Sequence, residues 1–177
     1  KDAWSKSLWH QYLAQQGYIV MSIDNRGTST PLGRDWRHHL HHNIGIHSAE
    51  DQSAAVRKLL QTHSYLDPNR IAVTGFSGGG SMSLNLLFRY PDLYKLAMAG
   101  GFISNQLLYD SIYQERYMGL PDDNPEGYKN GSPMTHVENL KGHLLIYHGT
   151  QDDNCHYQNF ENLVQELIKH NKQFTAV

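Results

Sequence analysis

Two hydrophobic patterns alternate along the chain: short continuous apolar runs, and longer stretches with an apolar residue every three or four positions. The short runs predict buried strands at Tyr18–Ile23, Ile71–Thr74, Leu96–Ala99 and Leu144–Tyr147, and a further strand that begins at Phe174. Because runs that are apolar throughout are buried on both faces, they are typical of a parallel sheet covered by helices.

The stretches between the runs predict the helices. One helix carries Trp4, Leu8 and Tyr12 and ends at Gly17, and a short one lies within residues 33–43. A third begins at a capping box, Ser48–Asp51, and runs to about Thr62. A fourth follows residue 80 and ends near Pro91, and a fifth carries Phe160, Leu163 and Leu167. Residues 102–140 are expected to form a long polar excursion. The alternation predicts an α/β fold, a mostly parallel, doubly wound sheet with helices on both faces.

Composition limits the functional classes. The chain has 177 residues, which suits one domain, and a formal net charge of −2, which gives no reason to expect a nucleic-acid partner. No apolar run reaches membrane-spanning length, and the single Cys155 excludes an internal disulfide. The chain begins without Met, in a helical pattern, and stops where a strand begins. We therefore expect residues 1–177 to be a fragment of a longer protein.

The strongest chemical motif is Gly75–Gly79, which reads G-x-S-x-G around Ser77. An apolar run precedes it and a helical stretch follows, so the motif predicts a sharp turn between strand and helix. Such a turn exposes the serine hydroxyl to a base and a substrate carbonyl, and small residues at Gly75 and Gly79 allow the backbones to approach. The backbone N–H of Gly78 would then face a developing oxyanion.

A second candidate lies after the run Leu144–Tyr147, where His148–Asn154 contains two adjacent carboxylates. Ligands of open parallel sheets bind beyond the carboxyl ends of the strands, so Asp152 or Asp153 could orient a catalytic histidine. The same residues could instead cap a helix that starts near His156, and both interpretations can hold together.

The general base should follow the acid, because the chain order serine, acid, histidine is typical of hydrolases on α/β sheets. Only His156 and His170 come after residue 154. His156 is too close to the acid loop, and His170 is expected at the far end of a helix, so neither suits the role. We expect the catalytic histidine beyond Val177, with His148 the hardest alternative to exclude.

Three stretches resemble the prolyl oligopeptidase family of serine peptidases, and in particular its dipeptidyl peptidase IV branch. They are Asp67–Gly79, Tyr109–Pro121 and His148–Asn154, with weaker similarity at Asp24–Gly27 and Glu50–Gln52. The resemblance implies an α/β-hydrolase fold and a β-propeller upstream of this chain. It also implies an activity that releases N-terminal dipeptides ending in proline or alanine through an acyl-enzyme.

The resemblance also implies roles for individual residues. Ser77 is the expected nucleophile, Asp152 the triad acid, and Asn154 the amide that binds a substrate backbone carbonyl. Tyr109 and Tyr113 are expected to wall the pocket for the proline ring, although tyrosines spaced by four residues are also compatible with ordinary core packing.

Three positions depart from the family pattern. Phe76 and Gly78 stand where this branch usually has Trp and Tyr, and Gln106 stands where it has another pocket aromatic. The tyrosine that supplies a second oxyanion donor would precede Lys1. These departures put strict specificity for X-Pro dipeptides in question.

The sequence also allows other interpretations. His38, His39, His41, His42 and His47 form a cluster compatible with zinc, but a solvated polar face suits its spacing better. An esterase or broader oligopeptidase could use the same fold and triad, and an inactive relative could act as an interaction module. No cofactor is expected, and the partner is a peptide substrate. A homodimer of the full-length protein and its localisation are left open. The isolated fragment, which would lack its base, is expected to be inactive.

Overall fold

The computed structural model describes residues 7–29 and 31–177. Within them the chain forms the following elements in order: α1 (Leu8–Gln15), α2 (Gly33–His38), α3 (His47–Thr62), β1 (Ala72–Phe76), α4 (Gly78–Arg89), β2 (Leu96–Gly100), the 3-10 helix η1 (Gln106–Leu108), α5 (Ser111–Met118), α6 (Pro125–Gly131), the 3-10 helix η2 (Pro133–Asn139), β3 (His143–Tyr147), α7 (Gln158–Lys169) and β4 (Thr175–Ala176). The predicted helix position Trp4 lies outside the described residues.

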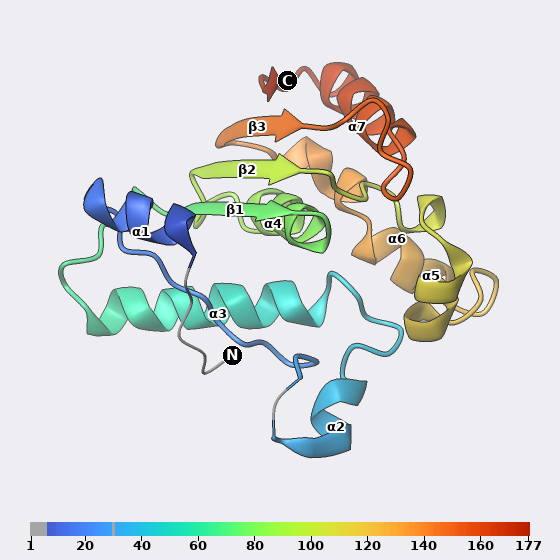
Figure 1. Cartoon of the computed structure of the whole chain (residues 1–177), viewed down its shortest axis with the longest axis horizontal. Coiled ribbons are helices and arrows are strands. Elements are labelled where there is room, and N and C mark those ends of the chain that lie inside the picture. Colours follow the sequence, from blue (N-terminus) through green and yellow to red (C-terminus); the bar gives the residue numbers. More distant parts are fainter. Residues whose placement is uncertain (1–6, 30) are drawn as a thin grey trace.

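The four strands form one parallel sheet in the order β1-β2-β3-β4, which Figure 1 shows stacked from β1 to the C-terminal β4. Phe76, Gly100 and Tyr147 lie side by side in the register, so three strands end along one line. The carboxyl ends of the strands therefore share one edge, and the loops that leave it lie close together.

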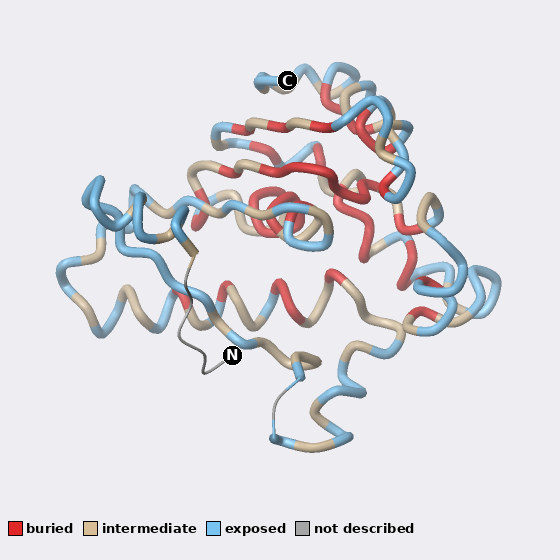
Figure 2. Tube along the Cα trace, viewed as in Figure 1, coloured by how far each residue is buried: buried red, intermediate tan, exposed pale blue. Residues whose placement is uncertain are grey.

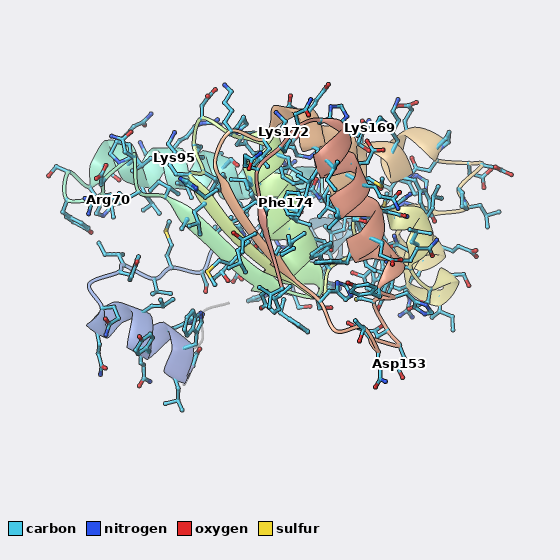
Figure 3. The ribbon with its side chains drawn as sticks, turned by 90° about the horizontal axis from the view of Figure 1, so that it is seen from above. Arg70, Lys95, Asp153, Lys169, Lys172 and Phe174 are labelled. Carbon is cyan, nitrogen blue, oxygen red and sulfur yellow. The ribbon has the colours of Figure 1, made fainter. Side chains whose placement is uncertain are left out.

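Helices cover the two faces of the sheet unequally. Figure 3 shows α7 on one side of the strands and α1 on the other. The side of α4 and α7 is closely packed, because Ala97 and Ala99 of β2 and Leu144 and Ile146 of β3 are buried beneath them. In α1, by contrast, no residue is buried. Figure 2 shows the same contrast, with buried stretches along β2, β3 and α4.

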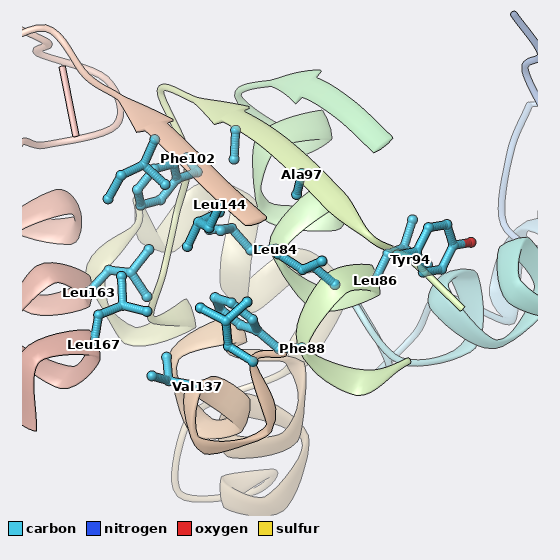
Figure 4. Close-up of a cluster of buried hydrophobic side chains, with 14 of the residues drawn as sticks. Leu84, Leu86, Phe88, Tyr94, Ala97, Phe102, Val137, Leu144, Leu163 and Leu167 are labelled. Carbon is cyan, nitrogen blue, oxygen red and sulfur yellow. The ribbon is translucent and has the colours of Figure 1, made fainter. Parts of the chain in front are cut away.

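The core lies between the sheet, α4, α7 and η2, as Figure 4 shows. Leu84, Leu87 and Phe88 of α4 are fully buried, and so are Leu163 and Leu167 of α7. These positions recur every three or four residues, so one stripe of each helix faces the sheet. Packing of this kind fixes α4 against β1 and β2, and thereby fixes the turn that joins β1 to α4.

The predicted strand at Tyr18–Ile23 is wrong. This segment belongs to no strand, and Tyr18 and Ile19 are 62% and 61% exposed. An apolar run forms a strand only where a neighbour pairs with its backbone, and no strand of the described chain does so. The end of the segment instead contacts α3, where Gln52 Nε2 donates to the Ile23 carbonyl at 2.7 Å.

The capping box at Ser48 is also wrong. Helix α3 begins earlier, at His47, and its N-cap Ile46 makes no side-chain cap. The neighbouring residues have another role: Asp51 accepts hydrogen bonds from the backbone N–H of Arg26 at 2.8 Å and from its Nε at 2.9 Å. The two weakly similar stretches, Asp24–Gly27 and Glu50–Gln52, thus form one contact that ties a loop to α3.

The predicted long polar excursion of residues 102–140 is also corrected by the structure. The segment contains four helical elements, and Phe102, Met118 and Val137 are fully buried in it. Its polar residues serve caps and turns, as when Asn124 accepts a hydrogen bond from Gly127 N–H at the start of α6. The high content of Gly, Pro and Asn therefore reflects short helices and their ends. The composition gave no sign that the segment also contributes buried residues.

Candidate active site

Ser77 lies on the predicted turn between β1 and α4. Its φ is 57°, a left-handed conformation that non-glycine residues rarely adopt, and its backbone N–H donates to the Gly100 carbonyl at 2.9 Å. Ser77 is the N-cap of α4, and its side chain makes no cap hydrogen bond. A strained residue that does not cap its own helix is typical of a site where the hydroxyl is needed for chemistry.

Close backbone packing explains two of the glycines around Ser77. A Cβ on Gly75 would lie 2.3 Å from the backbone of Gly79, and one on Gly80 would lie 2.5 Å from the Gly100 carbonyl oxygen. A Cβ on Gly79 itself would meet nothing within 4 Å. A side chain is therefore excluded at Gly75, as predicted, but not at Gly79. The second position that excludes a side chain is Gly80, one residue beyond the motif.

The N-terminus of α4 supplies a free donor beside the serine. The Gly78 N–H lies in the first turn of the helix, and no described residue accepts a hydrogen bond from it. The helix dipole adds partial positive charge at this point. An oxyanion formed on a carbonyl attacked by Ser77 can be stabilised there.

Ser77 and Gly78 open into a cavity of about 320 Å³. The cavity is lined by the turn, by α4, by the segment from Ile103 to Gln114, by the start of α3 and by the loop after β3; the residues concerned are Asn25, Leu40, Ile44, Gly45, Ser48, Ser77, Gly78, Ser81, Met82, Asn85, Ile103, Gln106, Tyr109, Tyr113, Gln114 and Cys155. A larger cavity of about 660 Å³ lies between α6, η2 and α7 and does not include Ser77. The smaller cavity is the candidate substrate site because it contains Ser77, the candidate nucleophile.

Tyr109 and Tyr113 both line this cavity, with ring centroids 5.4 Å apart in an edge-to-face arrangement. Tyr109 is not helical, since α5 begins at Ser111 after its N-cap Asp110, but the two rings still meet. Burial raises the pKa of both phenols, so they are neutral at physiological pH. They form an apolar wall beside Ser77.

Asn154 lies next to this wall. The Tyr109 hydroxyl donates to Asn154 Oδ1 at 2.9 Å. This bond occupies the amide oxygen of Asn154, so its NH2 group faces elsewhere and can donate to a ligand. Two of the three residues that the family resemblance assigns to substrate binding, Tyr109 and Asn154, are therefore in direct contact.

The acid loop distinguishes its two carboxylates. Asp152 is half-buried, and its Oδ1 accepts hydrogen bonds from the backbone N–H groups of Asn154 at 3.0 Å and Cys155 at 2.8 Å. This leaves Oδ2 for another donor. Asp153 is exposed and extends away from the body of the protein in Figure 3. The geometry favours Asp152 as the residue able to orient a histidine.

No histidine among the described residues lines the Ser77 cavity. His148 is buried against Phe102 and Phe160, and its Nε2 donates to the Cys155 carbonyl at 2.6 Å and lies 3.5 Å from Asp152 Oδ2. His156 is exposed, and His170 lies 3.6 Å from Glu166 at the end of α7 and lines the larger cavity. His148 thus braces the acid loop, and none of the three is placed to activate Ser77.

Sequence reasoning missed Cys155. Its thiol is buried and lies 4.0 Å from Ser77 Oγ, so it joins the turn to the acid loop. Burial raises the pKa of this thiol, so it is a neutral wall of the cavity. Its place directly after Asn154 was the available signal, since a residue adjacent to a binding amide at a strand end is expected near the site.

The histidines of the cluster make pairwise contacts in the structure. No group of three or more His, Cys, Asp or Glu side chains there is arranged to hold a metal ion. His41 and His42 stack on each other with ring centroids 3.9 Å apart, and His47 Nδ1 lies 3.0 Å from Glu50. The described helices also include none long and apolar enough to cross a bilayer.

Comparison with known proteins gives close matches. The chain is 38% identical over 173 residues to prolyl endopeptidase FAP of Mus musculus. The aligned region covers 96% of this chain and 22% of that protein. It is also 38% identical over 169 residues to a probable dipeptidyl-aminopeptidase B of Aspergillus terreus, across 93% of this chain and 18% of that one.

Solved structures agree with this. Porphyromonas gingivalis dipeptidyl peptidase 4 superimposes with a TM-score of 0.90 at 36% identity, covering 96% of this chain and 24% of that chain. A putative dipeptidyl aminopeptidase IV from Bacteroides ovatus gives a TM-score of 0.91 at 37% identity over 95% of this chain and 24% of that chain. These likenesses confirm the predicted α/β-hydrolase fold. The chain spans about a quarter or less of the length of these relatives. The model of the prolyl oligopeptidase family matches residues 4–177, and the chain belongs to that family.

Proposed function

We propose that the full-length protein is a serine peptidase of the dipeptidyl peptidase IV kind, which releases N-terminal dipeptides ending in proline or alanine. The observation that carries the proposal is the position of Ser77, strained on its turn and opening into a cavity walled by Tyr109 and Tyr113. The names of the relatives, which include dipeptidyl peptidases and a prolyl endopeptidase, support it.

In the proposed reaction, Ser77 Oγ attacks the backbone carbonyl carbon of the second residue of the substrate, while a histidine base takes its proton. The oxyanion faces the Gly78 N–H. Collapse of this intermediate breaks the peptide bond, and the base, now an acid, gives its proton to the leaving amine. Water then attacks the acyl-enzyme by the reverse path and frees the dipeptide.

The remaining residues have supporting roles in this proposal. Asp152 orients the histidine through Oδ2, and the amide NH2 of Asn154 binds a substrate backbone carbonyl. Because no described histidine lines the cavity, we propose that the base comes from a part of the full-length protein outside the described residues. The β-propeller expected from the resemblance would likewise belong to that protein.

The experiment is a panel of chromogenic substrates tested on the purified full-length protein. We expect Gly-Pro and Ala-Pro anilides to be cleaved, Gly-Ala more slowly, and blocked N-terminal analogues not at all. Cleavage of simple acyl esters without cleavage of any dipeptide anilide would move the protein to the esterase function. No turnover of either class would support the inactive relative.

A further inference from the structure

The Ser77 cavity follows one face of helix α4. Ser77, Gly78, Ser81, Met82 and Asn85 all line it, and residues at this spacing lie on the same side of a helix. Because an α-helix rises by about 1.5 Å per residue, Asn85 lies about 12 Å from Ser77 along the helix axis. The cavity is therefore a channel that begins at the candidate nucleophile and continues along α4 well past the turn.

The segment that enters α3 closes this channel at the end remote from Ser77. Gly45 and Ser48 both line the cavity, and a Cβ on Gly45 would lie 2.9 Å from Asn85 Nδ2. The same Nδ2 donates to the Gly131 carbonyl at 3.1 Å, so the Asn85 side chain is fixed at this end. Ser48, in the first turn of α3, therefore lies near the far end of the channel.

The walls between the two ends present hydrocarbon to the channel. They are formed by side chains from α4, from the segment before α3, from the loop after β2 and from the segment with the tyrosine wall; these are Met82, Leu40, Ile44, Ile103, Tyr109 and Tyr113. An apolar group that moves from water to such a wall stabilises the complex in proportion to the area that it buries. The channel therefore favours an apolar chain over a single methyl group.

Two side-chain amides along the channel are engaged with neighbouring groups. Asn85 Oδ1 accepts a hydrogen bond from Arg89 Nε at 3.0 Å, and Gln106 Nε2 donates to the Gly131 carbonyl at 3.3 Å. The described lining residues include no Asp, Glu, Lys or Arg. A charged side chain in the channel would therefore be buried without a counter-charge, which is unfavourable.

Two positions leave the channel open near Ser77. A Cβ on Gly78 would meet nothing within 4 Å, so the space beside the serine is free. Gly78 and Gln106 also stand at positions where the dipeptidyl peptidase IV branch usually has aromatic residues. A large ring at either position would take up space that an extended substrate side chain can use here.

We propose that this channel binds the side chain of the second residue of the substrate, and that it selects long, unbranched and uncharged side chains, such as methionine, over alanine. The proposal rests on the proposed peptidase function and adds a substrate class to it. A proline ring folds back onto its own nitrogen and would fill only the mouth beside Ser77, whereas an extended chain reaches along α4.

The test is a series of anilides in which the second residue grows by one methylene at a time: Gly-Ala, Gly-2-aminobutyrate, Gly-norvaline and Gly-norleucine. On the full-length protein we expect each added methylene to raise kcat/KM by roughly three- to five-fold, and the whole series by roughly 30- to 100-fold. Gly-Met should behave like Gly-norleucine, which it resembles in shape. Gly-Lys, equally long but charged at its end, should fall to the level of Gly-Ala or below.

Two variants locate the effect. Ser48→Leu fills the far end of the channel, so it should lower kcat/KM for Gly-norleucine at least about ten-fold more than for Gly-Ala, because the last methylenes lose their place. Ser64→Leu makes the same chemical change at an exposed position between α3 and β1 and should keep the wild-type ratio. The wild-type series needs no variant, so it tests the proposal even if Ser48→Leu does not fold.

Four outcomes would overturn the inference. A flat or falling series in the wild type would show that the chain does not enter the channel, and Gly-Lys cleaved as well as Gly-norleucine would contradict an uncharged lining. An unchanged ratio in folded Ser48→Leu would place the chain elsewhere. Failure to cleave any dipeptide anilide would remove the proposed function and this inference together, whereas cleavage of Gly-Pro with a flat series removes only the inference.

Discussion

The two ends of the Ser77 cavity are held in place by different forces. At the turn, backbone geometry alone sets the serine: the Ser77 N–H bonds to Gly100, and Gly75 packs against the backbone of Gly79. At the opposite wall, side-chain hydrogen bonds set the positions: the Gln114 amide donates to the Gln106 carbonyl, and the Tyr109 hydroxyl donates to Asn154. The first arrangement consists of backbone contacts between residues 4 and 23 positions apart, and the second consists of side-chain contacts between residues 8 and 45 positions apart.

The turn therefore governs the position of the reacting serine, whereas the side-chain wall governs which substrates fit. A turn built from close backbone contacts tolerates little change without displacing the serine. A wall built from side chains can exchange an aromatic ring for an amide without moving the nucleophile. In this chain Ser77 lies in an intact G-x-S-x-G motif, and the three positions that depart from the family pattern differ in their side chains: Phe76 and Gly78 on the turn, and Gln106 on the opposite wall.

The largest expected effect is at the nucleophile. Ser77→Ala in the full-length protein should lower kcat for Gly-Pro anilide by at least about 10⁴-fold, because the donors that remain contribute only residual catalysis. KM should change little, since the pocket wall is untouched. Steady-state kinetics at several substrate concentrations measure both. Near wild-type turnover in this variant would remove Ser77 from the mechanism.

The acid loop should give the next largest effect. Asp152→Asn should lower kcat by about 10²- to 10⁴-fold, because an amide at this position cannot stabilise an imidazolium. Asp153→Asn is the matched control, and it should lower kcat by less than about three-fold because its carboxylate is exposed. Both variants are compared at equal folded fraction. If Asp153→Asn were the more damaging of the two, the assignment of the acid would be wrong by one residue.

The backbone end of the cavity can be tested through stability. Gly75→Ala should lower the free energy of unfolding by about 3 kcal/mol, because its Cβ would collide with Gly79 and the backbone must move. Gly79→Ala adds the same atom in open space and should change it by less than about 1 kcal/mol. Urea unfolding of the full-length protein provides the comparison. Equal effects would mean that the turn is not held by close packing.

The smallest effect concerns the loop that brings Asn25 to the cavity. Burial acts to raise the pKa of Asp51, but the hydrogen bonds from Arg26 outweigh it and hold the pKa below its ordinary value. A carboxyl with a lowered pKa in the folded state stabilises the protein above its unfolded pKa, and this contribution is lost as the pH falls through the folded value.

Asp51→Asn should therefore lower the free energy of unfolding by about 1 kcal/mol at pH 7, and the difference from wild type should shrink as the pH falls below about 4. Urea titrations at pH 7 and at pH 3.5 measure it. Glu50→Gln, which changes the weaker and more exposed contact of Arg26, is the control and should show less than half of the effect. A difference that is independent of pH would mean that the ion pair does not contribute.

The sequence predicts some of these features and not others, depending on whether the signal is local. The strands β1, β2 and β3 and the turn at Ser77 were predictable because apolar runs and the glycine motif are local signals. The strand at Tyr18–Ile23 was not, because pairing depends on a neighbour and no pattern within the run reports one. The order of Asp152 and Asp153 came from the resemblance alone, since the spacing suited both.

Two residues of the cavity wall lay beyond sequence reasoning for a physical reason. Gln114 and Cys155 carry no motif, and they line the site only because α5 and the acid loop fold back beside the turn. The Gly, Pro and Asn content of residues 102–140 suggested a long polar excursion. In the structure the segment is held by helix caps and buried contacts, including Ser104 Oγ donating to the Asn159 carbonyl at 2.7 Å.

The central claim is that the strained turn makes Ser77 a nucleophile, and covalent labelling tests it most directly. The full-length protein is treated with a fluorophosphonate, which reacts with activated serines, and the modified residue is identified by peptide mass spectrometry. The account predicts a single label on Ser77, formed at least about 100-fold more slowly in Asp152→Asn because the base is then poorly oriented. Labelling of another serine would contradict it. Wild-type cleavage of Gly-Pro anilide by the Ser77→Ala variant would contradict it as well.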